Sequence, residues 1–171
     1  MIMKRLVNLL FFIAIFLFVG CEDEKADNDN MSVKEVTTDN VNDGPYYFNF
    51  VSGKKDSTAW HLSYQNLPAG GGNYMPSFAL NGTLMLAIDN SKEFDAIQTS
   101  PASSLFAPEG GRMQYGGSNG VLTYDMITHK VSTSNDNYII YDTISHKVYK
   151  IHFDEYSGGV VLFRYGELDG Q

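Results

Sequence analysis

The chain has 171 residues, of which 43% are hydrophobic and 19% charged, with a formal net charge of -8 and a single Cys. The length favours one folded domain, and a lone Cys excludes an intramolecular disulfide framework as well as zinc-finger and iron–sulfur sites. The acidic balance argues against nucleic acid as a partner, because proteins that bind it normally present a basic face that releases counterions from phosphate.

Residues 1–20 have the pattern of a signal peptide. Lys4 and Arg5 precede an uninterrupted apolar run over residues 9–20, which is shorter than the roughly 20 residues of a bilayer span. The run ends in Phe18-Val19-Gly20-Cys21, which resembles a bacterial lipobox, where the Cys is lipidated and becomes the mature N-terminus. Acyl chains on Cys21 would hold the protein on a membrane, at ~0.8 kcal/mol per buried CH₂. The alternative is a short anchor that stays uncleaved.

Residues 21–44 are predicted to be a lipidated Cys followed by an acidic flexible tether, since the stretch after Cys21 has almost nothing to bury. Acidic residues directly after a lipidated Cys also resemble the export signals of some lipoproteins on the outer face of a Gram-negative outer membrane. A plain spacer is the other interpretation. The expected location is therefore the outer membrane, with the domain exposed at the cell surface.

Residues 45–171 are predicted to form a single all-β, antiparallel domain. Short aromatic and β-branched runs alternate with clusters of Gly, Asn, Asp and Pro, which is typical of strands and turns. The expected strands are 46–51, 58–64, 74–80, 84–88, 121–125, 138–143, 147–153 and 160–165. Residues 138–153 give the clearest hairpin, although its alternation is imperfect, and a bulge is one explanation.

One short helix is expected over Ser91–Gln98, with Ser91 as its N-cap; no long amphipathic helix and no internal repeat is evident. The sequence carries no positive signal for an enzyme. The spacing of His61, His129, His146 and His152 matches no catalytic motif, and the glycine clusters open no helix that could cradle a phosphate. We therefore expect a binding protein without catalytic activity.

Five segments carry a resemblance to a known family. They are 58–64, 94–101, 120–129, 149–153 and 160–165, and their order and spacing resemble the HmuY family of haem-binding surface lipoproteins. The resemblance implies an all-β, hand-shaped fold, a haem gripped between two finger-like loops, and delivery to a TonB-dependent outer-membrane receptor. It also implies two axial iron ligands, which are His in some members and Met in others.

The resemblance places the second axial ligand at or beside Met126. Alternation with period two puts Leu122, Tyr124 and Met126 on one face at the end of a strand, so that Tyr124 would lie against the porphyrin. The alternative is that Met126 fills a gap in the core, as most Met do. His129 is the competing ligand, because imidazole commonly binds haem iron.

The first axial ligand is predicted to be Met113, in a glycine-rich stretch where the chain is shorter than the family pattern. Arg112 would then pair with a haem propionate, and Tyr115 would stack on the macrocycle. Met75, which follows three glycines, is the alternative ligand, and a packed surface position for Met113 is the alternative role.

The expected function is haem acquisition by a surface lipoprotein that binds haem non-covalently. The other hypothesis is a surface lipoprotein that binds a glycan or a protein partner through Tyr-rich loops with Tyr46, Tyr47 and Tyr115, since aromatic platforms suit sugar faces as well as porphyrin.

Overall fold

A computed structural model describes residues 32–169 of the chain. Within them the fold is mostly β, and its elements are β1 (Lys34–Thr37), β2 (Tyr46–Asn49), β3 (Lys54–Lys55), β4 (Leu62–Gly70), β5 (Asn73–Leu80), β6 (Leu84–Asp89), η1 (Phe94–Ala96), η2 (Ser103–Leu105), β7 (Ala107–Pro108), β8 (Leu122–Asp125), β9 (Lys130–Thr133), β10 (Asn137–Asp142), β11 (Val148–Ser157) and β12 (Val160–Leu168). The predicted all-β, antiparallel class is confirmed. The proposed signal peptide and Cys21 lie outside the described residues.

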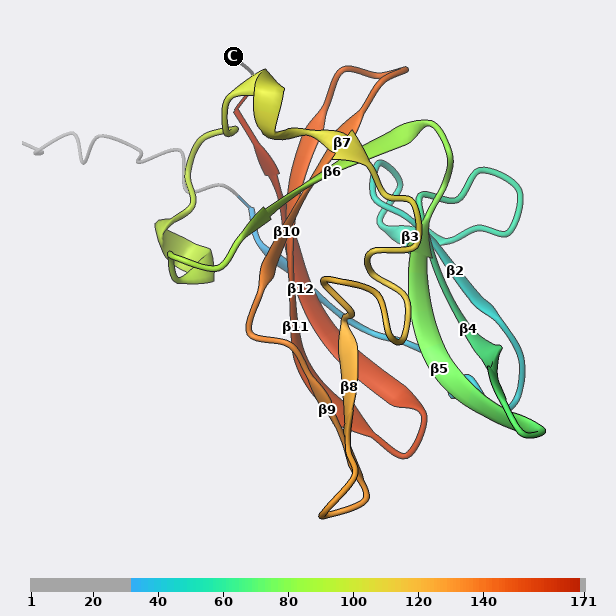
Figure 1. The fold of residues 1–171 in the computed structure, drawn as a ribbon. Helices are drawn as coiled ribbons and strands as arrows, with labels where there is room; N and C mark the ends of the chain where they lie inside the picture. The colour runs from blue at the N-terminus through green and yellow to red at the C-terminus, as the bar shows by residue number, and fades with distance from the viewer. Residues whose placement is uncertain (1–31, 170–171) are drawn as a thin grey trace, which may run out of the picture. The chain divides into compact units, whose positions relative to one another are not determined.

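The strands form two larger antiparallel sheets and one separate hairpin (Figure 1). The order in the six-stranded sheet is β1-β12-β11-β10-β6-β7, and in the four-stranded sheet it is β3-β2-β4-β5. The third sheet is the hairpin of β8 and β9 alone. A two-stranded hairpin has little stability of its own, so its base must be held by the domain. That base is anchored by Val121 and Leu122, both buried in the core.

The core is filled by aromatic rings that join the two larger sheets. Phe78 of β5 lies 4.6 Å from Phe153 of β11 between ring centroids, and Phe48 of β2 lies 5.5 Å from Phe163 of β12. Tilted and edge-on ring pairs of this kind stabilise a core beyond the area that they bury. The alternating aromatic residues of these strands therefore specify both sheets and their packing.

Strand β11 is buried on both faces, which explains the imperfect alternation in its sequence. Tyr149, Ile151 and Phe153 belong to the main core, whereas Val148 packs in a second cluster on the other face. Lys150 also points to that second face, where its Nζ donates hydrogen bonds of 3.0 and 2.8 Å to the carbonyls of Phe94 and Ile97. The irregularity in register falls later, between Phe153 and Glu155 in the pairing of β11 with β12.

The predicted tether is wrong for its second half. Residues Lys34–Thr37 form β1, which pairs with β12, and Val41 is buried in the core. The strand was not predicted because an edge strand is held mainly by backbone hydrogen bonds to one neighbour and needs few apolar side chains. The compact unit therefore begins well before residue 45.

The short helical turn lies inside the segment predicted for it, but without the predicted cap. The 3₁₀ turn η1 has Glu93 at its N-cap and no side-chain capping bond. Ser91 instead bonds to the carboxylate of Asp89, through its backbone N–H at 2.9 Å and its hydroxyl at 2.8 Å. Among residues 32–169, no helix is long and apolar enough to cross a membrane.

Candidate functional site

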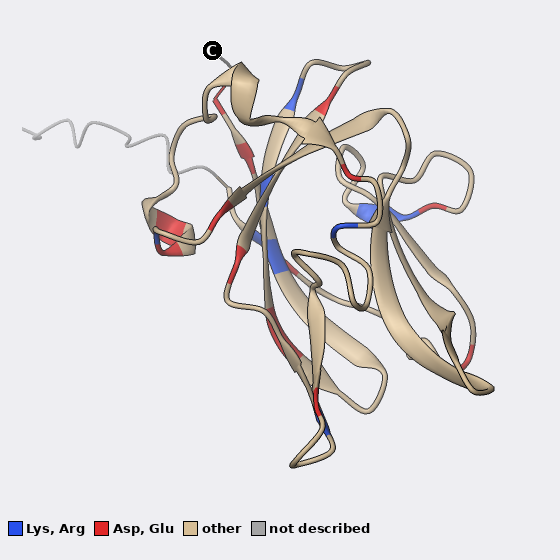
Figure 2. Ribbon diagram, viewed as in Figure 1, with Lys and Arg blue, Asp and Glu red and all other residues tan. Residues whose placement is uncertain are grey.

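The tip of the β8–β9 hairpin carries the two most exposed large apolar side chains of the described residues. Met126 is 74% exposed and Ile127 is 90% exposed. The tip itself, residues 126–129, has no Lys, Arg, Asp or Glu; Asp125 precedes it and Lys130 follows it in the sequence. Figure 2 shows one acidic and one basic stretch next to the tip of this hairpin. A thioether and an aliphatic side chain therefore stand side by side in solvent on a tip without charged residues.

The turn is held by the side chains of three residues, Tyr124, Asp125 and His129. Oδ1 of Asp125 accepts hydrogen bonds from the backbone N–H groups of Ile127 at 2.7 Å and Thr128 at 3.2 Å, and these bonds lower the pKa of the carboxyl. The Tyr124 hydroxyl lies 2.7 Å from Nδ1 of His129. His129 has a φ of 54°, a left-handed conformation that costs energy for a non-glycine residue. Met126 therefore stands on a hydrogen-bonded turn, and its thioether is exposed to solvent.

The same turn occurs a second time, and the sequence analysis missed it. Residues 124–131 read Tyr-Asp-Met-Ile-Thr-His-Lys-Val, and residues 141–148 read Tyr-Asp-Thr-Ile-Ser-His-Lys-Val. In the second copy the Tyr141 hydroxyl also lies 2.7 Å from Nδ1 of His146, whose φ is 58°, and Ile144 is 72% exposed. Figure 1 shows the two turns at opposite ends of the domain, after β8 and after β10.

Comparing the two copies shows which residues the turn itself requires and which residue is particular to the first turn. The Tyr, Asp and His that hold the turn are present in both copies, so they are explained by its geometry. The residue after the Asp differs, because Met126 stands where the second copy has Thr143. Comparison of residues 124–131 with 141–148 is the sequence signal that would have found this.

Met113 is not where the haem prediction needs it. Its side chain is fully buried in the main core, and its backbone N–H donates to the Glu109 carboxylate at 2.8 Å. A sulfur packed on all sides cannot reach an iron at the surface unless the core opens. The prediction of Met113 as a ligand is therefore wrong for this conformation, because tight turns bend the glycine-rich loop inward and carry the apolar side chain into the core.

Substituting Met113 tests this assignment. Met113→Leu keeps the volume and should change the free energy of unfolding by less than about 1.5 kcal/mol, whereas Met113→Ala should destabilise the domain by about 2–5 kcal/mol. Urea unfolding followed by fluorescence measures both. Loss of haem binding by a stably folded Met113→Leu variant would restore Met113 as a ligand.

Arg112 is also not available for the predicted role. Its Nη2 donates to the carbonyls of Leu86 at 2.8 Å, Ala107 at 3.1 Å and Pro108 at 3.1 Å. The guanidinium thus ties the glycine-rich loop to β6 and β7 rather than reaching towards a propionate. The pairing with a haem propionate is therefore contradicted.

Tyr115 and Tyr124 do come together, as the haem prediction requires. Both line a cavity of about 340 Å³ whose other walls are residues 116–120, the base of β8, Ser134 and Asp136. Gly117 has no room for a side chain, because a Cβ there would overlap the carbonyl oxygens of Gly111 and Arg112. The loop can therefore fold back tightly and set Tyr115 beside the hairpin.

The β4–β5 hairpin supplies a second projecting element near the first. Strand β5 contacts β8, and the backbone N–H of Tyr115 donates to the Ser77 hydroxyl of β5 at 3.1 Å. Figure 1 shows the β4–β5 and β8–β9 hairpins extending towards the same end of the domain. At the far end of β5, Tyr74 is 63% exposed and Met75 is half-buried. Met75, the alternative first ligand, is therefore better placed to reach a haem than the buried Met113.

Tyr46 does not belong to an aromatic platform for a glycan. Its ring is buried in the core, where burial raises its pKa to about 12. Tyr47 packs on Trp60 with ring centroids 5.5 Å apart. Of the three tyrosines named for that hypothesis, Tyr115 alone is exposed.

No family model and no curated protein matches the chain. Residues 32–169 contain no group of three or more His, Cys, Asp or Glu that could hold a metal ion. The assignment of a function therefore depends on the geometry of the two hairpins.

Proposed function

We propose that this protein is a surface lipoprotein that binds haem non-covalently between the β4–β5 and β8–β9 hairpins, without catalysis. In this proposal Met126 is one axial ligand of the iron, Met75 is the other, and Tyr115 and Tyr124 contact the porphyrin. Anchoring through Cys21 in the outer membrane and transfer of the haem to a TonB-dependent receptor are part of the same proposal.

The observation that carries the proposal is that Met126 is exposed on a turn whose second copy, at the other end of the domain, has Thr143 at the same position. A buried Met needs no explanation beyond packing, but the sulfur of Met126 contributes nothing to the core. The second copy shows that the turn forms with Thr at this position. A ligand for that sulfur would account for the Met, and thioether sulfur is an established axial ligand of haem iron.

His129 is the competing ligand on the same turn. Its Nδ1 is engaged by the Tyr124 hydroxyl, so that its Nε2 is the atom open to a ligand. Metal-bound imidazoles commonly bond through their second nitrogen in this way. The same arrangement at Tyr141 and His146 favours a structural role for both pairs, which leaves Met126 as the distinguishing donor.

The redox state of the iron gives the direct test. Thioether ligation raises the reduction potential relative to bis-His ligation, so ferrous haem should bind more tightly than ferric haem. Titrations in air and under dithionite, followed at the Soret band, measure the two affinities. Equal or tighter binding of ferric haem would refute coordination by two Met.

The second candidate function, a glycan or protein partner on exposed tyrosines, is favoured only by Tyr74 and Tyr115. The two candidates are separated by mixing the protein with haemin and removing free haemin by desalting. Retained colour with a Soret band supports the haem proposal, and a colourless protein contradicts it.

A further inference from the structure

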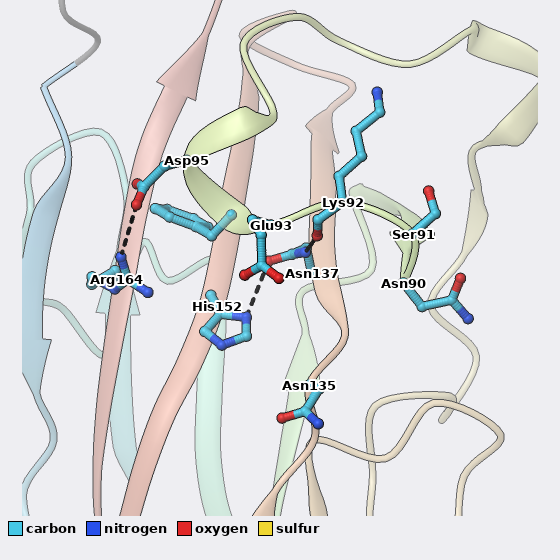
Figure 3. Close-up of a pocket in the computed structure, with 10 residues that line it drawn as sticks. Asn90, Ser91, Lys92, Glu93, Asp95, Asn135, Asn137, His152 and Arg164 are labelled. Atoms are coloured by element: carbon cyan, nitrogen blue, oxygen red, sulfur yellow. Dashed lines mark hydrogen bonds and ion pairs between the residues drawn. The ribbon is translucent and has the colours of Figure 1, made fainter.

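A polar cavity of about 450 Å³ lies on the face of the domain that carries η1, with walls made by the segment after β6 and by β10, β11 and β12. Figure 3 shows Asn90 and Ser91 on one side of it, Asp95 and Arg164 on the other, and His152 with Asn135 below. It shares no lining residue with the cavity beside the β8–β9 hairpin. The volume is within the range of small-ligand pockets.

The hydrogen bonds of Asn137 leave Nε2 of His152 as a hydrogen-bond acceptor that can face a ligand. The Asn137 amide donates to the carbonyls of Asp89 at 3.3 Å and Lys92 at 2.8 Å, so its Oδ1 is left to accept from Nδ1 of His152 at 3.0 Å. A neutral imidazole that donates from Nδ1 carries its lone pair on Nε2. The buried Asn137 therefore fixes the tautomer and the orientation of the His152 ring.

On the opposite wall, charged side chains hold Arg164 and the Phe94 ring in place. Arg164 makes bidentate contacts of 2.8–3.1 Å with the Asp154 carboxylate, and its guanidinium lies 4.8 Å from the centroid of the Phe94 ring. Nζ of Lys150 lies 4.4 Å from the same centroid. Cations at such distances are attracted to the ring, so Phe94 is held in place as part of the lining.

Three further polar side chains around the cavity, those of Asn90, Glu93 and Asn135, are exposed. They make no hydrogen bond or ion pair with the described residues, so they are open to solvent and to a ligand. Two amides supply both donors and acceptors, Glu93 supplies an acceptor, and Nε2 of His152 supplies another. The charges of the lining balance, with Lys92 and Arg164 against Glu93 and Asp95. Arg164 Nη1 lies 3.7 Å from the Asp95 carboxylate, and Lys92 Nζ lies 4.0 Å from the Asp89 carboxylate.

We infer that this cavity binds a neutral, hydroxyl-rich ligand, namely one sugar ring of a glycan. Each sugar hydroxyl both donates and accepts, which matches a wall of amides, a carboxylate and an imidazole acceptor. An apolar ligand would leave these groups unpaired, and an acidic sugar would meet Glu93. The site is independent of the haem proposal and of the exposed tyrosines.

The test is a titration of the ¹⁵N-labelled full chain with D-galactose, with D-mannose and with D-glucuronate, followed by NMR. At least one neutral hexose should cause saturable shifts at the side-chain amides of Asn90 and Asn135 and at the His152 ring, with smaller shifts for glucuronate. Glu93→Gln and Asn135→Ala should each weaken hexose binding about tenfold, as expected for one or two lost hydrogen bonds.

Glu155→Gln and Asn73→Ala are matched controls, since both residues are exposed and lie outside the cavity. They should leave hexose binding unchanged. No saturable shift with either hexose, glucuronate binding as tightly as the hexoses, or binding insensitive to Asn135→Ala would overturn the inference. Haem titration of Asn135→Ala keeps the two proposals apart, because that variant should bind haem normally.

Discussion

Met126→Thr should lower the affinity for haem at least ~100-fold, more than the 10–100-fold that loss of an outer partner of a metal site typically costs. The variant gives the first turn the residue of the second, at Thr143, so the hairpin should still form. Haem titration at the Soret band measures the loss, and a thermal unfolding curve like that of the unchanged protein shows that the fold is retained.

Ile127→Ala is the matched control, because it removes exposed apolar surface from the same tip and leaves the thioether. It should weaken haem binding by about fivefold or less. Met75→Ala should behave like Met126→Thr, whereas Met85→Ala, on β6 of the other sheet, should bind haem normally. Native affinity in Met126→Thr would refute Met126 as a ligand.

His129→Asn decides between the two donors on the tip, since Asn tolerates the left-handed backbone that this position requires. We expect nearly unchanged haem affinity, with His146→Asn as the equivalent change in the second turn. Loss of haem binding in His129→Asn, together with native binding in Met126→Thr, would make the His129 imidazole the axial ligand in place of Met126.

Phe153→Ala should have the largest effect on stability, a loss of about 3–5 kcal/mol. The ring is almost fully buried and lies 4.6 Å from Phe78, 5.5 Å from Tyr138 and 5.8 Å from Phe163 between centroids. Its removal would leave a cavity between the two larger sheets, which rigid neighbours cannot close. Urea unfolding measures the change.

Ile144→Ala is the control for this change, because the side chain stands exposed on the second turn. It should alter the free energy of unfolding by no more than about 0.5 kcal/mol. A loss below about 1 kcal/mol in Phe153→Ala would mean that the two sheets do not share the core described above.

The sequence predicted the fold class and most of the longer strands, because aromatic and β-branched runs separated by turn residues are a local signal. Strands β5, β6, β8, β10 and β12 lie close to their predicted ranges. The short strands β1, β3, β7 and β9 were missed, since each is set by pairing with a neighbour distant in sequence or by the hairpin itself.

The site was predicted only in part. Alternation placed Tyr124 and Met126 near the end of a strand, and the structure brings Tyr124 to the same cavity as Tyr115. For Met113 and Arg112 the sequence shows a Met and an Arg amid glycines, a pattern that fits an exposed loop as well as one that folds inward. The tight turns of residues 109–120 carry Met113 into the core and Arg112 onto backbone carbonyls.

By itself the sequence determined the β class, the acidic balance and the composition of each turn, all of which depend on residues close together along the chain. The tertiary structure alone decided which Met is buried, which tyrosines share a cavity and that two like turns lie at opposite ends of the domain. The physical reason is that burial depends on long-range strand pairing and packing, which no local pattern of residues encodes.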